Sequence, residues 1–209
     1  MATAEFRFYA ELNAFISRPF RHRPFMHEYA RDATVKHAME ALGVPHTEVE
    51  LILANGVPAG FSRRMRDGDR ISVYPHFQRL DISTVTCVPA RPVRGVKFIA
   101  DAHLGQLARH LRMLGFDVLY RNSYSDAEVA CIAAGEARIV LTRDRDLLIR
   151  KDIVLGCYLH SIVCEEQICE VLMRFDLARS IRAFSRCLTC NGLLRAIDKQ
   201  AVMHRVPDT

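Results

Sequence analysis

Hydrophobic and polar positions alternate with a period of two in the first stretch of the chain. In EFRFYAEL, Phe6, Phe8 and Ala10 alternate with polar neighbours, which is typical of a half-buried strand. PFMHEYA predicts a second strand, and DATVKHAMEALG changes to helical spacing, with Asp32 as the candidate cap and Gly43 as the stop. VELILANG and RMRDGDRISVYP predict further strands next to Asn-Gly and Asp-Gly turns. Mixed strands around one helix predict an α+β roll.

The second part of the chain alternates apolar strands with amphipathic helices. VKFIAD, FDVLYRN, RIVLTRD and GCYLHS predict strands, and VKFIAD is apolar enough to be buried on both faces. LGQLARHLRMLG, SDAEVACIAAGEA, DLLIRK and EEQICEVLMRF predict the helices between and after them. This βαβαβ order predicts an α/β domain with a parallel sheet and helices on both faces.

A proline-rich stretch without periodicity separates the two parts and predicts a linker. We expect a first domain, a linker, a second domain and a C-terminal segment, at residues 1–78, 79–95, 96–183 and 184–209.

Composition narrows the class of protein. Half of the 209 residues are hydrophobic, but no apolar run approaches the ~18–20 residues of a membrane span. The start MATAEFRF does not have the pattern of a signal peptide, so we expect a cytoplasmic protein with no membrane partner. The net charge is +5, and 25 of the 29 basic residues are Arg, whose guanidinium suits phosphate, although a GC-rich genome gives the same bias. The seven cysteines are irregularly spaced and do not predict a disulfide framework.

Four acidic residues follow the predicted parallel strands. Asp101 ends the first strand, Asp126 follows the second, and Asp144 and Asp146 follow the third. Ligands of open parallel sheets bind beyond the carboxyl ends of the strands. Converging carboxylates there need a hard cation, so we expect Mg²⁺ or Mn²⁺, with Asp101, Asp144 and Asp146 as ligands. A water bound to such a cation is a candidate nucleophile for phosphodiester hydrolysis.

Structural roles compete with this interpretation at several positions. Asp101 precedes a helix and has the position of its cap. Ser125 and Glu128 fit a capping box, which makes Glu128 a cap partner rather than a ligand. Asp126 is suited to stabilising the same helix N-terminus through the helix dipole.

Arginines near the predicted strand ends are candidates for phosphate binding. Arg109 and Arg112 are expected on the polar side of the first helix of the second domain, and Arg143 and Arg145 flank the third strand's acidic residues. The alternative for the helical arginines is an ordinary solvated face. His103 is a candidate for proton transfer, although a lone histidine is more often structural.

Cys187 and Cys190 have the spacing of a zinc knuckle. Two thiolates in C-x-x-C followed by Asn-Gly supply half of a tetrahedral zinc site. His204 is a candidate third ligand, but no fourth is evident. We therefore expect a partial zinc ribbon over residues 184–209. A shortened chain, ligands from a second chain, or a vestigial pair each explain the missing ligands, and we favour the first.

The first domain resembles the ubiquitin-like β-grasp domains of the sulfur-carrier type. The resemblance lies in ATVKHAMEALGVP, VELILANGVPA and MRDGDRISVYP. The carriers act through a C-terminal Gly-Gly tail, but here SVYP is followed by His76 and a whole second domain. The resemblance therefore implies a binding or packing module whose protein partner the sequence does not identify.

The second domain resembles the Mut-seven C-terminal RNase family, a branch of the PIN-like nucleases. The motifs are KFIADAHLGQLARHLRMLGFDVLYRN, SDAEV, RIVLTRDRDLL and FSRCLTCNGLL, in the family's order. The resemblance implies a divalent cation, cleavage of RNA and a second Cys pair further along the chain. In this family the nuclease domain is often fused behind a ubiquitin-like domain, and the resemblance also implies a candidate homodimer. The family's acidic positions fall on Asp101, Asp126, Asp144 and Asp146.

The sequence thus favours a β-grasp domain followed by a PIN-like α/β domain that acts as a metal-dependent ribonuclease. Two alternatives stay open: a non-catalytic RNA- or tRNA-binding module, and a sulfur-transfer accessory protein. The absent Gly-Gly tail counts against the second, and four carboxylates near an anionic ligand count against the first.

Overall fold

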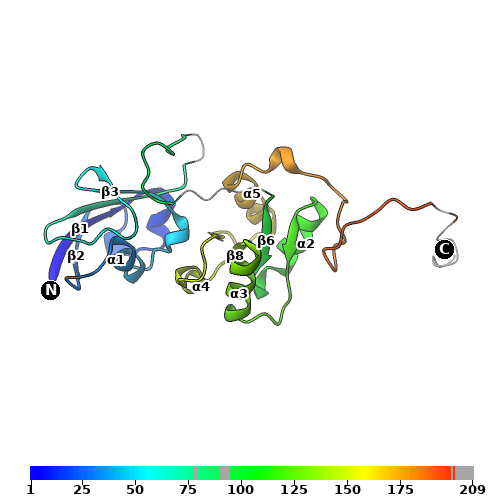
Figure 1. Cartoon of the computed structure of the whole chain (residues 1–209), viewed down its shortest axis with the longest axis horizontal. Coiled ribbons are helices and arrows are strands. Elements are labelled where there is room, and N and C mark those ends of the chain that lie inside the picture. Colours follow the sequence, from blue (N-terminus) through cyan, green and yellow to red (C-terminus); the bar gives the residue numbers. More distant parts are fainter. Residues whose placement is uncertain (78–79, 90–94, 199, 201–209) are drawn as a thin grey trace.

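The computed structural model describes residues 1–77, 80–89, 95–198 and 200, which form two sheets with separate hydrophobic cores (Figure 1). The first sheet has five strands in the order β2-β1-β5-β3-β4 and the second has four strands in the order β7-β6-β8-β9. The expected α+β and α/β parts are therefore both present. Among the described residues, no helix combines the length and apolar character needed to cross a membrane.

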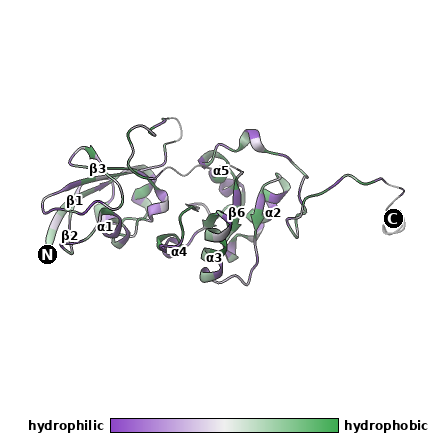
Figure 2. Cartoon of the chain, in the orientation of Figure 1, coloured by the Kyte–Doolittle hydropathy of each residue, from purple (hydrophilic) through white to green (hydrophobic). Residues whose placement is uncertain are grey.

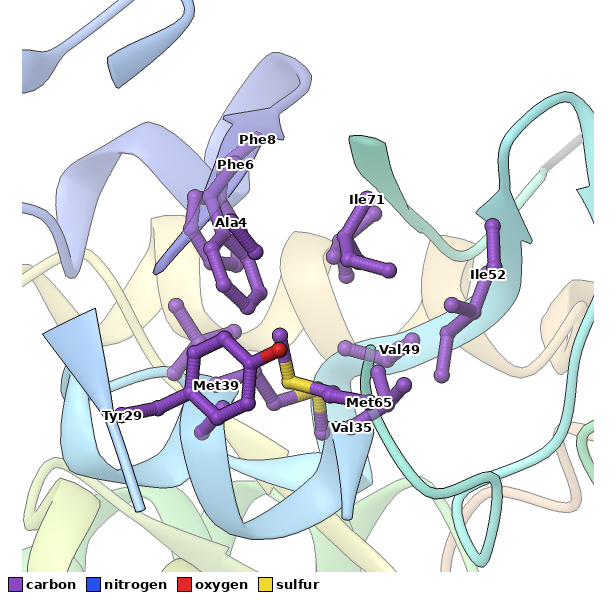
Figure 3. Packing of buried hydrophobic residues seen from close by; sticks show 14 of the residues in the cluster. Ala4, Phe6, Phe8, Tyr29, Val35, Met39, Val49, Ile52, Met65 and Ile71 are labelled. Atoms are coloured by element: carbon purple, nitrogen blue, oxygen red, sulfur yellow. The ribbon is translucent and has the colours of Figure 1, made fainter. Parts of the chain in front are cut away.

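The first domain is a β-grasp roll around one helix. Its elements are β1 (Ala2–Phe8), β2 (Phe25–Tyr29), α1 (Val35–Ala41), β3 (Val49–Ala54), β4 (Val57–Pro58) and β5 (Arg70–Pro75). β1 and β5 are parallel, and the other neighbouring strands are antiparallel. Side chains from β1, α1, β3 and β5 converge between the sheet and the helix, including Phe6, Met39, Ile52 and Ile71 (Figure 3).

Two local predictions in this domain were wrong. Ala10 does not continue the first strand: β1 ends at Phe8, and Ala10 is exposed with a φ of 46° at the start of a 3-10 helix, η1 (Ala10–Ala14). Asn13 stabilises this turn, because its side-chain amide donates to Phe8 O and Ala10 O at 2.9 and 3.0 Å. Thr34, not Asp32, caps α1 by accepting a hydrogen bond from a backbone N–H at 3.2 Å.

A buried carboxylate organises the turn before β5. Asp69 accepts hydrogen bonds from Arg63 Nη1 at 2.7 Å, from the Arg66 N–H at 2.7 Å and from Asn55 Nδ2 at 2.8 Å. Burial acts to raise the pKa of Asp69, but these hydrogen bonds outweigh it and lower the pKa to about 2. The charged carboxylate therefore stabilises the folded domain.

The second domain is a three-layer α/β unit. Its strands are β6 (Lys97–Ala100), β7 (Asp117–Leu119), β8 (Ile139–Thr142) and β9 (Gly156–Tyr158), all parallel. Its helices are α2 (Gly105–Met113), α3 (Asp126–Glu136), α4 (Arg145–Ile149) and α5 (Cys164–Arg174).

Alternate side chains of the central strands enter two cores. Phe98 and Leu141 pack with α2 and α5 on one face, whereas Ile99 and Val140 pack with α3 and α4 on the other. After Lys97, the residues of β6 are hydrophobic, while α2 carries both colours in Figure 2. The sequence prediction of a parallel sheet covered on both faces is confirmed.

Side chains from outside the sheet occupy both of its edges. At the β7 edge, the Val118 N–H donates to Asn191 Oδ1 at 3.1 Å, and Val118 O accepts from Arg112 Nε at 2.9 Å. At the β9 edge, the Tyr158 N–H donates to Glu48 Oε1 at 2.9 Å. The C-terminal segment thus satisfies one edge, and the β-grasp domain satisfies the other.

The two domains are in close contact along β9. Glu48 belongs to η3 (His46–Glu48) of the first domain and lies 3.5 Å from Arg174 of α5. Phe15 packs edge-to-face on Tyr158, with ring centroids 4.9 Å apart. Tyr158 packs against the β-grasp core and against the core under α3 and α4. One aromatic ring therefore joins the cores of the two domains.

Part of the segment expected to be a linker packs against the first domain. Within residues 80–89, Ile82 and Val88 are buried, and Thr86 Oγ1 donates to Glu50 O at 2.6 Å. The lack of hydrophobic periodicity in this segment reflects its irregular backbone, but the described part of it is anchored to the first domain.

Candidate active site

Asp101 stands at the carboxyl end of β6, where its carboxylate is fixed from two sides. Oδ1 accepts a hydrogen bond from the Ala102 N–H at 2.6 Å, and Oδ2 accepts from Thr142 Oγ1 at 2.7 Å. The first contact makes Asp101 the cap of a 3-10 helix, η4 (Ala102–Leu104), as the structural alternative predicted. Each oxygen keeps lone pairs for a further ligand, so capping and ligand binding are compatible.

Thr142 connects the two strands at which the acidic residues stand. It is the last residue of β8 and fully buried, and its hydroxyl also accepts the Asp144 N–H at 2.9 Å. In the sheet, β7 lies on one side of β6 and β8 lies on the other, so the strand order reverses at β6. Open parallel sheets bind ligands at the carboxyl ends of the strands where this reversal occurs. One buried hydroxyl therefore positions Asp101 and the start of the acidic loop together. The sequence reasoning missed this residue, whose signal is a polar side chain at the end of the apolar run IVLT.

Asp144 and Asp146 lie in the first turn of α4. Asp144 Oδ1 accepts the Asp146 N–H at 2.8 Å and so caps the helix. The side chain of Asp146 is 78 % exposed and lies 3.3 Å from Arg145 Nε. Asp144 is thus anchored in the loop, whereas Asp146 projects into solvent.

Asp126 begins α3 and is exposed. Ser125 and Glu128 form the predicted capping box: Ser125 Oγ accepts the Glu128 N–H at 3.4 Å, and Glu128 Oε2 accepts the Ser125 N–H at 2.8 Å. This backbone hydrogen bond lowers the pKa of Glu128. Glu128 is therefore a cap partner, as expected.

The expected three-carboxylate metal site is not assembled in this conformation. Within the part of the chain that the structure describes, no three His, Cys, Asp or Glu side chains lie together as a metal-ligand group. Asp101 and Asp144 are linked through Thr142, and their hard oxygen donors fit Mg²⁺ or Mn²⁺. Mg²⁺ is commonly held by one or two carboxylates, with water and substrate phosphate completing its shell. The donor chemistry fits, but Asp146 is not brought in as a third ligand.

The predicted phosphate-binding arginines divide into two groups. Arg109 and Arg143 are exposed and take part in no ion pair of the described residues. Arg145 is half-exposed, pairs with Asp146 and lies against Gly43. These three are accessible to a substrate.

The prediction for Arg112 was wrong. This side chain is 5 % exposed, and its Nη1 donates to Leu188 O and Thr189 O at 3.0 and 2.9 Å, in addition to its bond with β7. Burial lowers its pKa. Arg112 therefore holds the C-terminal segment on the domain and does not reach a substrate.

The cysteine pair lies in the turn that Arg112 holds. The Asn191 N–H donates to Cys187 O at 3.0 Å, and residues 186 and 193 form an isolated bridge. N–H groups of Cys190 and Thr189 face the Cys187 sulfur and lower its pKa. This turn favours a thiolate, but a complete zinc ribbon is not seen in the described residues, and His204 lies outside them.

A cavity of about 380 Å³ lies at the other end of the sheet. Ile139 and Gly156, the first residues of β8 and β9, line it together with Glu50, His76 and Arg174. None of Asp101, Asp126, Asp144 and Asp146 lines it. The acidic edge, and not this cavity, is therefore the candidate active site.

The fold and this edge define a parallel-sheet α/β domain with acidic residues beyond its carboxyl edge, preceded by a β-grasp domain. Residues 96–209 match the family model described as Mut7-C RNAse domain, and residues 1–81 match the one described as Mut7-C ubiquitin. The first match covers more than half of the chain, and the chain belongs to the Mut7-C family, as the resemblance predicted.

Two solved structures that are similar to this chain each cover just over a third of it. A crystal structure of small archaeal modifier protein 1 from Haloferax volcanii is 21 % identical, with a TM-score of 0.31, and covers 37 % of this chain and 100 % of that one. A second structure of the same protein is 21 % identical, with a TM-score of 0.30, covering 36 % and 97 %. No curated protein matches the chain.

Proposed function

We propose that this protein is a metal-dependent ribonuclease that hydrolyses RNA phosphodiester bonds at the carboxyl edge of the second sheet. The observation that carries the proposal is the Thr142 hydroxyl, which fixes Asp101 and the Asp144 loop at the ligand-binding point of the sheet. A family described by its RNAse domain supports the same chemistry.

The carboxylates of Asp101 and Asp144 would hold Mg²⁺ or Mn²⁺, with water and RNA phosphate completing the shell. When bound, the cation would supply charge neutralisation and would lower the pKa of a water at the site. Asp101 cannot swing away, because a buried hydroxyl and a backbone N–H hold both its oxygens. Asp126 and Asp146 complete the acidic edge as exposed carboxylates.

Arg109, Arg143 and Arg145 would bind the RNA backbone. Carboxylates repel phosphate, so an RNA strand needs cations beside the acidic edge. Guanidinium groups supply charge and paired donors for phosphate oxygens. These arginines position the strand and need carry no sequence preference.

Cleavage of labelled RNA with Mg²⁺, with Mn²⁺ or with EDTA tests the proposal, with an unstructured RNA and a tRNA as separate substrates. Asp144→Asn should reduce cleavage by orders of magnitude while RNA affinity holds or rises, because a negative charge is removed. Asp32→Asn is the matched control, since Asp32 is an exposed carboxylate of the first domain that pairs with Arg64. Full activity of the Asp144 variant would overturn the assignment.

The unassembled three-carboxylate site favours one other candidate, an RNA-binding module without catalysis. The same assay separates the two. Binding of RNA without cleavage under any cation would support the module, whereas EDTA-sensitive cleavage that Asp144→Asn abolishes would exclude it.

A further inference from the structure

The segment between η1 and β2, which contains a short 3-10 helix, η2 (Arg18–Phe20), concentrates positive charge. Its sequence SRPFRHRP, residues 17–24 and here called the arginine loop, contains Arg18, Arg21 and Arg23 and no acidic residue. All three arginines are exposed, and none takes part in an ion pair within the described residues. Unpaired guanidinium groups held close together attract an anionic partner.

The arginine loop is held in place by its own contacts. Arg21 Nε donates to Ile16 O at 2.7 Å, and the His22 N–H donates to Asn13 Oδ1 at 2.7 Å. Phe20 stacks on Phe25 of β2, with centroids 4.7 Å apart. Arg21 therefore stabilises the conformation of the loop. Arg18 and Arg23 have no ion-pair partner among the described residues and lie on a backbone that these contacts hold in place.

An aromatic contact anchors the chain just before the arginine loop to the second domain. Phe15, two residues before the loop, packs on Tyr158 and on His160, at 4.9 and 5.9 Å between centroids. Tyr158 is the last residue of β9 and lies in register with Thr142 of β8. The loop is thus anchored one strand away from the hydroxyl that positions Asp101.

A second contact brings the β-grasp domain against the acidic loop itself. Gly43, which follows α1, has a φ of +91°, and a Cβ there would lie 3.0 Å from Arg145 Nη1. A larger residue would be strained and would displace the arginine beside Asp144. The first domain therefore forms one side of the candidate active site.

We propose that the arginine loop is part of the RNA-binding surface and that Arg18 and Arg23 bind phosphates of a single-stranded RNA entering the acidic edge. This inference rests on the proposed function. Arg143 and Arg145 offset the carboxylates from the nuclease domain, and the arginine loop extends the cationic track across the domain boundary. The ubiquitin-like domain thereby determines how long a strand the protein binds.

RNA affinity of Arg18→Ala/Arg23→Ala tests this role. Arg31→Ala/Arg66→Ala is the matched control: both arginines are exposed and unpaired among the described residues, and they lie by the N-terminus, far from the second domain (Figure 1). Fluorescence anisotropy with a labelled single-stranded RNA, in an Asp144→Asn background with Mg²⁺, gives affinity without cleavage.

The loop variant should bind about tenfold more weakly, and the slope of log affinity against log salt should fall by about 1.4, or about 0.7 for each lost phosphate contact. The control variant should keep the affinity and the slope. With Asp144 intact, the loop variant should raise the KM for long RNA and leave cleavage of a dinucleotide unchanged, because a dinucleotide is too short to reach the loop.

The outcomes separate this inference from the proposed function. Cleavage by the unsubstituted protein together with unchanged affinity, KM and salt slope in the loop variant would overturn the loop's role alone. Loss of affinity in the loop variant from a protein that cleaves nothing would support the loop's role and overturn the nuclease. An equal loss in the control variant would show general charge attraction and overturn the loop's role.

Discussion

Replacing Thr142 by Val removes one hydroxyl from a buried site and keeps its shape. The hydroxyl donates to Asp101 Oδ2 at 2.7 Å and accepts the Asp144 N–H at 2.9 Å. Valine has the same branching at Cβ but can neither donate nor accept a hydrogen bond. The variant therefore asks whether the position of Asp101 depends on this single group.

The expected cost follows from the two hydrogen bonds. A hydrogen bond to a charged group contributes about 1.5–3 kcal/mol, and a neutral one about 1 kcal/mol. Asp144 is exposed, so in the variant water replaces the Thr142 hydroxyl as the acceptor for the Asp144 N–H. We expect Thr142→Val to lower the free energy of unfolding by about 2–3 kcal/mol and, because Asp101 loses its fixed orientation, to slow cleavage by about 10- to 100-fold.

Urea unfolding and cation-dependent RNA cleavage measure the two effects. Thr142→Ser is the control: it keeps the hydroxyl and loses one methyl group, at about 1 kcal/mol of stability. Serine should retain most of the cleavage rate. Equal activity of the valine variant and the unsubstituted protein, or an equal loss in the serine variant, would refute the role of the hydroxyl.

Three further outcomes follow from contacts described above. The pKa of Asp69 is about 2 in the folded protein and about 3.9 in the unfolded chain, so its carboxylate stabilises the fold fully above pH 4 and loses this effect as the pH falls toward 2. In urea unfolding experiments, Asp69→Asn should lower the free energy of unfolding by about 2 kcal/mol at pH 7 and should weaken its dependence on acid pH. Arg112→Met should destabilise the protein and make Cys187 react faster with thiol reagents, because Arg112 holds the C-terminal segment. RNA affinity should fall in Arg109→Ala but not in Arg112→Met, and a selective loss of RNA binding in Arg112→Met would contradict the placement of Arg112. Metal analysis should find well under one zinc per chain, because Cys187 and Cys190 have no further ligand among the described residues; one tightly held zinc in the monomer would contradict this.

Sequence patterns predicted elements wherever burial repeats with a regular period. The apolar strands and the striped helices of the second domain fall where expected, since one residue in two or in 3.6 faces a core. The cap of α1 was misassigned because Asp32 and Thr34 are both competent caps, and their identities do not tell which one the backbone places at the end. Ala10 fits the alternation of β1, but the Asn13 side chain, three residues later, bends the chain away.

The candidate site was predicted in part. Asp101, Asp126, Asp144 and Asp146 follow strands in the sequence, so their position at one sheet edge follows from parallel topology. Arg112 was misplaced because a helical arginine is ordinarily solvated, and two of its carbonyl partners, Leu188 and Thr189, are more than 70 residues away. Contacts between distant segments leave no local pattern.

The positions of Phe15 and Thr142 show the same limit. An isolated aromatic residue in a loop gives no sign that it will pack on another domain, and a threonine at a strand end looks like any β-branched strand former. The role of Thr142 becomes visible only when β6 and β8 lie side by side, and that of Phe15 only when the first domain packs on β9.

The two occupied edges of the second sheet bear on how the nuclease domain behaves by itself. A bare strand edge presents free N–H and C=O groups on which a strand of another molecule can add. Here Glu48 of the first domain hydrogen-bonds to the β9 edge, and Asn191 and Arg112 hydrogen-bond to the β7 edge. These contacts block the addition of a further strand at either edge of the sheet. A fragment cut to the compact middle of the chain would keep Arg112 but lose Glu48 and Asn191, which leaves the Tyr158 and Val118 N–H groups without these partners. We therefore expect such a fragment to associate edge to edge more readily than the whole chain.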